Sequence, residues 1–433
     1  MIAEPSPDAQ ALPTGGLGAG NDSMIDMPLE KPPTPVNVER IAALADQCVQ
    51  CGLCLPTCPT YALDRDEAES PRGRIAIAAA LARGQADPVE GLRQSLDHCL
   101  GCLNCETVCP AKVRYGELLI TTRSLIGPAS KRPRRLLALL QHPRRLRALR
   151  RLGGWLAMPR WKQRLARRLP STSAWRAALA TLPARGPAPR VHASSPAEEG
   201  ALALFPGCVA SVEDAEAQQA AITLLEAAGH HVSVLPAFCC GAMDLHGGEA
   251  SAAEQAARRV QAAWRQSGAA RLLSVTPGCL GALRRALPDV EVIDPLSLLA
   301  ERIDRLRFRP LPQTVAVHLP CSQINTARSD TALLQLLRQV PGLDAQPLPR
   351  PPHCCGAAGS HMLEFPERAA RLRDATLRQA ATLAPRQLLS SNIGCRLHLT
   401  AGNESQAPRW PSQHPLTLLA RQLDPTSPSQ DRP

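Results

Sequence analysis

Two groups of four cysteines near the N-terminal end of the chain share one spacing, C-x2-C-x2-C-x3-C, and each is followed by proline. The first group begins at Cys48 and ends before Pro59, and the second begins at Cys99 and ends before Pro110. This spacing is typical of chains that bind 4Fe–4S clusters, because three thiolates on one tight loop can reach three iron atoms of the same cube. The proline directs the fourth cysteine away from that loop, toward another cluster.

The spacing therefore predicts two 4Fe–4S clusters that exchange their fourth ligand. The first cluster would be bound by Cys48, Cys51, Cys54 and Cys109, and the second by Cys99, Cys102, Cys105 and Cys58. Gly52 and Gly101 fit this prediction, since the backbone must approach the sulfur atoms closely and offer N–H donors. Two alternatives stay open, namely a zinc ion at each group and buried free thiols. The duplicated spacing with both prolines disfavours them.

The second half of the chain contains an internal duplication, which covers residues 201–300 and 314–420. The matched segments are ALALFPGC (201–208) with TVAVHLPC (314–321), PAFCCGA (236–242) with PPHCCGA (351–357), and VTPGC (275–279) with SNIGC (391–395). The matched cysteines are offset by 113 to 116 residues. Offsets that agree so closely do not arise by chance. Each copy predicts the same order of strand, helix, strand, CCG, helix, strand and cysteine.

Each copy carries four cysteines that could form one metal or cluster site. The first candidate site is Cys208, Cys239, Cys240 and Cys279, and the second is Cys321, Cys354, Cys355 and Cys395. Neighbouring side chains on an extended strand point to opposite faces, so the chain must turn if both adjacent cysteines address one site. Gly241 and Gly356 permit that turn. The alternative is that these cysteines are small buried hydrophobic residues.

Helices that alternate with short apolar strands place this second half in an α/β architecture with a largely parallel sheet. In the first copy we expect helices over 214–228 and 251–267 and strands over 231–236 and 271–276. A further helix is expected over 72–83, between the two N-terminal groups. Four of the eight cysteines follow a predicted strand directly, where the ligands of parallel sheets bind; these are Cys208, Cys279, Cys321 and Cys395.

The predicted fold class combines α+β and α/β domains, with a helical two-cluster ferredoxin domain before a duplicated α/β CCG domain. The predicted divisions are a disordered tail (1–35), the ferredoxin-like domain (36–127), a basic helical linker (128–200), CCG repeat 1 (201–310), CCG repeat 2 (311–423) and a second disordered tail (424–433). Both tails are rich in Pro and Ser and lack apolar periodicity.

The positive charge of the chain is concentrated in one segment. The 433 residues include 49 Lys and Arg against 38 Asp and Glu, a net charge of +11, and residues 118–197 hold 18 of the basic residues and no acidic one. Arg144, Arg145, Arg150 and Arg151 are interleaved with leucines, a pattern that fits a helix on an anionic membrane surface, docking against an acidic partner or a solvated linker. Nucleic-acid binding is not expected, because no recognised motif accompanies the charge.

The sequence also predicts where the protein resides. The N-terminus has no basic region followed by an apolar stretch, and no apolar run approaches the roughly 18 residues of a membrane-spanning helix. We therefore expect a cytoplasmic protein, with optional peripheral contact to the inner face of the cytoplasmic membrane through residues 130–176.

Two ferredoxin motifs followed by two CCG motifs resemble the CCG-domain iron–sulfur proteins, which include heterodisulfide reductase subunits and the iron–sulfur subunits of membrane-associated flavoprotein dehydrogenases. Within that group the chain looks most like the glycolate oxidase iron–sulfur subunits. The resemblance is carried by DQCVQCGLCLPTCPTY (46–61), ESPRGRI (69–75), HCLGCLNCETVCPAKVRYGEL (98–118), HCCGAAG (353–359) and SSNIGCRLHL (390–399). Where that family often has a fifth cysteine in each repeat, this chain has Ala282 and His398.

The resemblance implies an electron-transfer subunit with no catalytic residue for the organic substrate. A partner subunit holding FAD would oxidise glycolate or another 2-hydroxy acid, and electrons would pass through the 4Fe–4S clusters, and through any further clusters in the CCG repeats, to a quinone or other carrier. The alternatives are a heterodisulfide-reductase-like catalytic subunit, the iron–sulfur subunit of a lactate or glycerol-3-phosphate dehydrogenase, and a scaffold whose CCG half binds no cluster.

Overall fold

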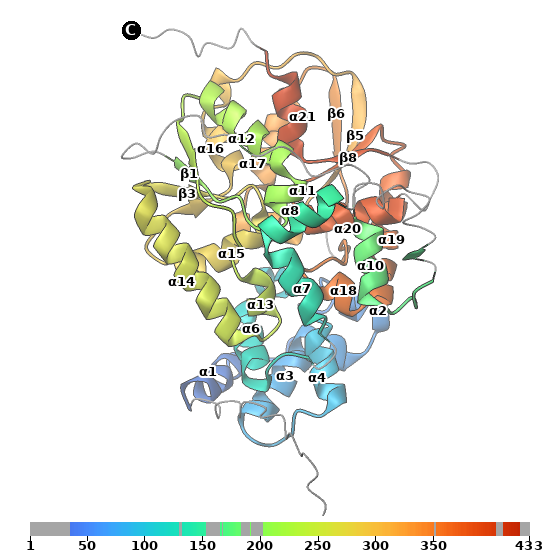
Figure 1. Ribbon diagram of the computed structural model, residues 1–433. Helices are drawn as coiled ribbons and strands as arrows, with labels where there is room; N and C mark the ends of the chain where they lie inside the picture. The colour runs from blue at the N-terminus through green and yellow to red at the C-terminus, as the bar shows by residue number, and fades with distance from the viewer. Residues whose placement is uncertain are drawn as a thin grey trace, which may run out of the picture.

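The computed structural model describes residues 35–129, 132–152, 165–166, 168–182, 191, 202–349, 352–403 and 410–424 (Figure 1). The two predicted tails lie almost entirely outside the described residues. Within the described part of the chain, no helix combines the length and the apolar character needed to cross a membrane.

The N-terminal part of the chain is helical and surrounds the first two cysteine groups. Its helices are α1 (Pro35–Ala45), α2 (Pro59–Asp64), α3 (Pro71–Ala82), α4 (Glu90–Asp97), α5 (Asn104–Thr107) and α6 (Tyr115–Ile126). Both α2 and α3 begin with proline, which is favoured in the first helical turn, and the Ser70 hydroxyl caps α3 by accepting a hydrogen bond from the Gly73 N–H. Helices α1, α3 and α6 enclose a small apolar core that includes Ile41, Leu44 and Leu118.

The basic segment forms short helices that pack on the second half of the chain. Those described are α7 (Arg134–Gln141), α8 (Pro143–Leu152) and α10 (Ala174–Thr181). Leu136, Leu137 and Leu146 are buried, and α10 contacts helices of the second CCG repeat. The segment predicted as a linker therefore forms a layer over the CCG repeats in its described part.

The first repeat contains a four-stranded parallel sheet in the order β2-β1-β3-β4. Its elements are β1 (Leu202–Leu204), α11 (Ala210–Glu213), α12 (Ala215–Ala227), β2 (Val232–Val234), α13 (Ala242–His246), α14 (Ala250–Ser267), β3 (Arg271–Leu273), α15 (Pro277–Ala286), β4 (Val292–Ile293) and α16 (Pro295–Glu301). The parallel sheet and the two predicted helices are confirmed, and the fourth strand was not predicted.

The second repeat has the same topology, with the strand order β6-β5-β7-β8. Its elements are β5 (Gln313–His318), a π-helical turn (Ser322–Ala327), α17 (Asp330–Arg338), β6 (Leu343–Pro347), α18 (His361–Glu364), α19 (Pro366–Ala381), β7 (Gln387–Ser390), α20 (Ile393–Asn403), β8 (Ser412–Gln413) and α21 (Pro415–Gln422).

The two repeats share a large hydrophobic cluster. Helix α21 at the end of the second repeat packs on α12 of the first, and α16 packs on α17 of the second (Figure 1). One buried cluster accordingly contains Leu204 and Leu224 from the first repeat together with Val315, Leu333 and Leu419 from the second.

Candidate iron–sulfur centres

The first predicted cluster site is a small cavity at the edge of the helical part. Cys48, Cys51, Cys54 and Cys109 all line a cavity of about 30 Å³, and Cys105 reaches it as well. The loop turns through left-handed conformations at Gln50 and Gly52 (φ 53° and 80°), and Arg72 donates a hydrogen bond to the Gln50 carbonyl. Cys51 is the one exposed cysteine of the sixteen.

The second predicted site is more deeply enclosed. Cys58, Cys99, Cys102 and Cys105 line a cavity of about 20 Å³ together with Arg74 and Tyr115. The structure thus places the fourth cysteine of each motif beside the first three cysteines of the other motif. Ligation itself stays a prediction, because the cavity shows which thiols meet and not what they bind.

Burial raises the pKa of thiols at the second site, and nearby cations lower the pKa of one of them. Burial raises the pKa of Cys102 and Cys105 well above the ordinary value. Burial alone would also raise the pKa of Cys99, but the guanidinium groups of Arg74 and Arg123 hold it below its ordinary value. The Arg123 side chain also donates to the Cys99 carbonyl. One side of this site is therefore electropositive.

The four cysteines of each CCG repeat meet in a row of thiol contacts. In the first repeat Cys239 contacts Cys208 and Cys240, and Cys240 contacts Cys279. In the second repeat the same order joins Cys321, Cys354, Cys355 and Cys395, and the sulfur atoms of the last two are 2.8 Å apart. The structure therefore brings together both sets of four that the duplication predicted.

The turn that the adjacent cysteines require is made by the glycine after them. Gly241 and Gly356 have φ values of 85° and 77°, in the left-handed region that favours glycine. In both repeats the glycine N–H donates a 3.4 Å hydrogen bond to the sulfur of the first cysteine of the pair, Cys239 or Cys354. Hydrogen bonds from the neighbouring thiols, led by Cys208 and Cys321 respectively, lower the pKa of these two cysteines well below the ordinary value.

The thiols of the second repeat lie against the second ferredoxin site. The amide nitrogen of Asn325, in the π-helical turn, donates 2.7 Å hydrogen bonds to the Cys102 carbonyl and to Asn104 Oδ1. Arg368 on α19 reaches Glu69 Oε2 at 2.8 Å. Burial is the largest cause of the raised pKa of Cys102, and the charge of the nearby Cys354 is the second largest. These contacts hold the two sites side by side.

Sequence reasoning did not identify Asn325 or Arg368, and it gave no role to Arg74 within the segment ESPRGRI. Asn325 and Arg368 bind partners in the ferredoxin part that are remote in the sequence, and Arg74 lines the second site beside cysteines of both motifs. His398, which replaces a family cysteine, places Nε2 3.2 Å from the Ala369 carbonyl, and burial lowers its pKa to about 4. It is a neutral hydrogen-bonding side chain there.

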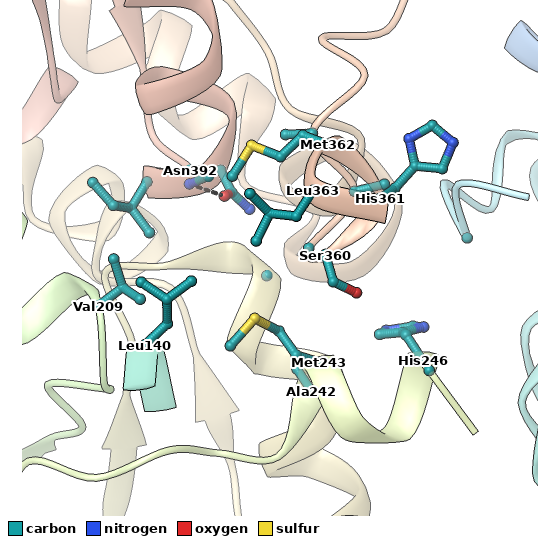
Figure 2. A pocket seen from close by; sticks show the side chains of 18 of the residues that line it. Leu140, Val209, Ala242, Met243, His246, Ser360, His361, Met362, Leu363 and Asn392 are labelled. Atoms are coloured by element: carbon teal, nitrogen blue, oxygen red, sulfur yellow. Dashed lines mark hydrogen bonds between the residues drawn. The ribbon is translucent and has the colours of Figure 1, made fainter. Parts of the chain in front are cut away.

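A large cavity separates the two repeats and reaches the second ferredoxin site. Its volume is about 1340 Å³, and it is lined by all eight CCG cysteines and by Cys99 and Cys102. Figure 2 shows side chains from both repeats around the hollow, among them Met243 on α13 and Met362 on α18. Leu140 of α7 and Trp175 of α10 add a wall from the basic segment. The sequence gives no signal for this cavity, since its walls come from remote segments.

The arginines of α8 divide into exposed and buried side chains. Arg144, Arg145 and Arg151 are exposed. Arg150 is buried, and its Nε lies 2.7 Å from Glu213 Oε1 on α11. Arg150 is therefore not part of the exposed basic face of α8, because its charge is used inside the protein. Among the described residues, no group of three or more His, Cys, Asp or Glu side chains is arranged so that it could hold a single metal ion.

Comparisons with known proteins agree with the arrangement of these sites. The 4Fe-4S dicluster domain family matches residues 44–113, and the cysteine-rich (CCG) domain family matches residues 202–284 and 315–400. The chain is 28% identical to the glycolate oxidase iron-sulfur subunit of Escherichia coli K12, over 84% of this chain and 91% of that protein. It is also 28% identical to the probable glycolate oxidase iron-sulfur subunit of Bacillus subtilis, over 83% and 89%.

A more distant relative belongs to another enzyme. One of the subunits of the dihydromethanophenazine:CoB–CoM heterodisulfide reductase of Methanosarcina barkeri is 24% identical over 83% of this chain and 89% of that protein. These relatives are subunits of oxidoreductases. We conclude that the chain contains a 4Fe-4S dicluster domain and two CCG domains and is similar, along most of its length, to the iron–sulfur subunits of glycolate oxidase.

Proposed function

We propose that the chain is the electron-transfer subunit of a flavoprotein 2-hydroxy-acid dehydrogenase of the glycolate oxidase kind. The observation that carries this proposal is the series of adjoining thiol sets, which runs from an exposed first site through a buried second site to the second CCG repeat. The FAD that oxidises the 2-hydroxy acid would be held by a partner subunit. Lactate and glycerol-3-phosphate dehydrogenases would use a similar iron–sulfur subunit. The relatives favour the glycolate oxidase function over these two.

The donor sets suit iron–sulfur clusters. All sixteen cysteines are free thiols and fall into four sets of four, and thiolate is the ligand that such clusters take. The first two sets would hold 4Fe–4S clusters, and the two CCG sets are candidate sites for two more. Such clusters supply one-electron transfer when bound. The chain's own residues keep the sites adjacent, exclude water from the second and donate backbone N–H groups, such as that of Gly356, to sulfur.

We place the electron acceptor in the large cavity between the repeats. The cavity is far larger than the two ferredoxin sites (about 1340 Å³ against 20 and 30 Å³), so it has room for a small molecule as well as for clusters at the CCG cysteines. Besides the cysteines, its lining includes many Leu and Ala side chains together with Met243 and Met362, and such apolar walls suit a ring compound such as a quinone. Exposed Leu149 and Trp175 lie where it borders the basic segment, next to arginines that would face an anionic membrane.

The alternative function is disulfide reduction by the CCG half itself. It is favoured by one observation, that both CCG thiol sets face the same cavity, together with the heterodisulfide reductase relative. An assay of the anaerobically purified chain with a reduced viologen dye and a disulfide separates the two functions. Turnover of the disulfide would support this alternative and contradict the proposal of a purely electron-carrying subunit.

The iron and acid-labile sulfide content of anaerobically purified protein tests the main proposal. Two cubane clusters would give about eight irons per chain, and clusters in all four sites about sixteen. A value near eight would assign clusters to the ferredoxin part alone. Protein that folds and carries neither iron nor sulfide would contradict the proposed function.

A further inference from the structure

A buried arginine lies directly beside the second ferredoxin site. Arg74 on α3 lines the small cavity with Cys58 and Cys99, and only 1% of its surface is exposed. Its Nη1 donates to Thr60 Oγ1 at 2.9 Å, and that hydroxyl lies 3.2 Å from Cys58 Sγ. Its Nε donates to the Ser95 carbonyl at 2.6 Å. These hydrogen bonds therefore hold the guanidinium group in a fixed position next to the thiols.

A single carboxylate balances this buried charge. Arg74 Nη2 lies 2.6 Å from Glu69 Oε2. The Glu69 carboxylate also meets His98 at 2.7 Å and Arg368 at 2.8 Å. Glu69 is therefore shared among several donors, and Arg74 is not neutralised by a partner of its own. Arg123, which is also buried, adds a second cation on the Cys99 side.

The first ferredoxin site has a different environment. Its nearby cation is Arg72, whose side chain is 34% exposed and is paired with the exposed Glu67. Water can stabilise charge at this site, whereas the second site is enclosed by protein. Adding one electron to a cluster adds one negative charge, and removing solvent makes that addition harder. A fixed cation in a region of low dielectric offsets this cost strongly.

We propose that Arg74 and Glu69 are a charge pair that sets the reduction potential of the second ferredoxin cluster. Arg74 raises the potential, and Glu69 lowers it. This inference rests on the proposed function, because it assumes a cluster at Cys58, Cys99, Cys102 and Cys105. It assigns a role to two residues that bind no iron and goes beyond the claim that the chain carries electrons.

A redox titration monitored by electron paramagnetic resonance tests the pair on anaerobically purified full-length protein. In Arg74→Gln, the midpoint potential of one of the two cubane signals should move to a more negative value while the other stays unchanged. In Glu69→Gln, the same signal should move to a more positive value. Arg74→Lys keeps the charge and should restore most of the wild-type potential. A Cys51→Ser variant, which perturbs the first site, identifies the signal that must not respond.

Opposite shifts in the two glutamine variants cannot arise from a general loss of folding. Arg72→Gln is the matched control, since it removes a cation beside the first site and should leave the responding potential unchanged. Potentials that stay fixed in both Arg74→Gln and Glu69→Gln, or that move in the same direction, would overturn the inference alone. Absence of both cubane signals from wild-type protein would overturn the proposed function as well.

Discussion

The glycine that follows each adjacent cysteine pair controls whether four thiols can meet. At Gly356 the left-handed φ of 77° already disfavours other residues by about 1–2 kcal/mol, and an added Cβ would collide with the Ala369 carbonyl in α19. We predict that Gly356→Ala lowers stability by about 3 kcal/mol or more, since overpacking adds to the backbone strain. Thermal unfolding and iron content measured together check this, and both should fall.

Gly84 provides the matched control for that substitution. It also has a left-handed φ of 66°, but a Cβ there would meet nothing within 4 Å. Gly84→Ala should therefore show the backbone strain alone, about 1–2 kcal/mol, and keep the iron content of the wild type. Equal losses of stability in the two variants would show that the contact with Ala369 has no energetic effect.

Residues with a distinctive spacing could be predicted, and residues that act across motifs could not. The thiols named from the cysteine spacing and from the duplication lie together in the structure, and their binding of clusters stays a prediction. Asn325 and Arg368 contact the ferredoxin part from more than 200 residues away, and a single Asn or Arg in a sequence carries no signal for such a contact.

Among the elements, the long amphipathic helices were predicted well and the short strands only in part. The helix expected over 251–267 is α14 (Ala250–Ser267), because its apolar face repeats over several turns. Strands β4 and β8 have two residues each, and so short a run shows no periodicity. Helices α15 and α20 place Cys279 and Cys395 in their first turns, which explains why these cysteines follow strands β3 and β7.

Helix α8 offers a test of membrane contact that the structure sharpens. Arg144, Arg145 and Arg151 are exposed, and attraction to anionic lipid is worth about 1 kcal/mol for each such cation. We predict that changing these three to Gln reduces flotation with anionic liposomes by at least about tenfold. Arg150 must be left intact, because its removal would leave the buried Glu213 carboxylate without this cation.

The control for that experiment is a second helix with the same loss of charge. Arg258, Arg259 and Arg265 on α14 are also exposed, and their change to Gln lowers the net charge equally. If α8 contacts the membrane, these three substitutions should leave flotation close to that of the wild type. The same decrease in both triple variants would show that only overall charge matters, and that α8 has no specific contact.

At the scale of the whole molecule, the two repeats face each other across a shared core and a shared cavity. The exchange of α16 and α21 between repeats fixes their relative position, so both thiol sets open into one space. The duplication could be predicted from sequence. The exchange and the cavity could not, because they depend on how two similar halves dock, and matching patterns do not specify that geometry.

The repeats nevertheless differ in what they adjoin, and this asymmetry predicts unequal effects of equivalent substitutions. The second repeat places a thiol next to the second ferredoxin site, since Cys354 lies close to Cys102 and Asn325 bonds to the Cys102 carbonyl. The first repeat contacts this site through the His246 carbonyl, which accepts a hydrogen bond from Arg123. Electrons that leave the ferredoxin part should therefore enter the second CCG site first. We predict that Cys354→Ser slows electron transfer from the dithionite-reduced chain to decylubiquinone much more than Cys239→Ser, the equivalent change in the first repeat.

Stopped-flow reoxidation of the reduced chain measures this difference, with iron content showing that the ferredoxin clusters remain in both variants. The two cysteines form a fair comparison, because each is the first of its pair, accepts the same glycine N–H bond and has a pKa lowered by the neighbouring thiols. Their contacts within the repeats are alike, and Cys354 is the one that lies beside Cys102 of the second ferredoxin site. Equal rates in the two variants would mean that electrons leave without passing the second repeat, and the proposed order of sites would have to be abandoned.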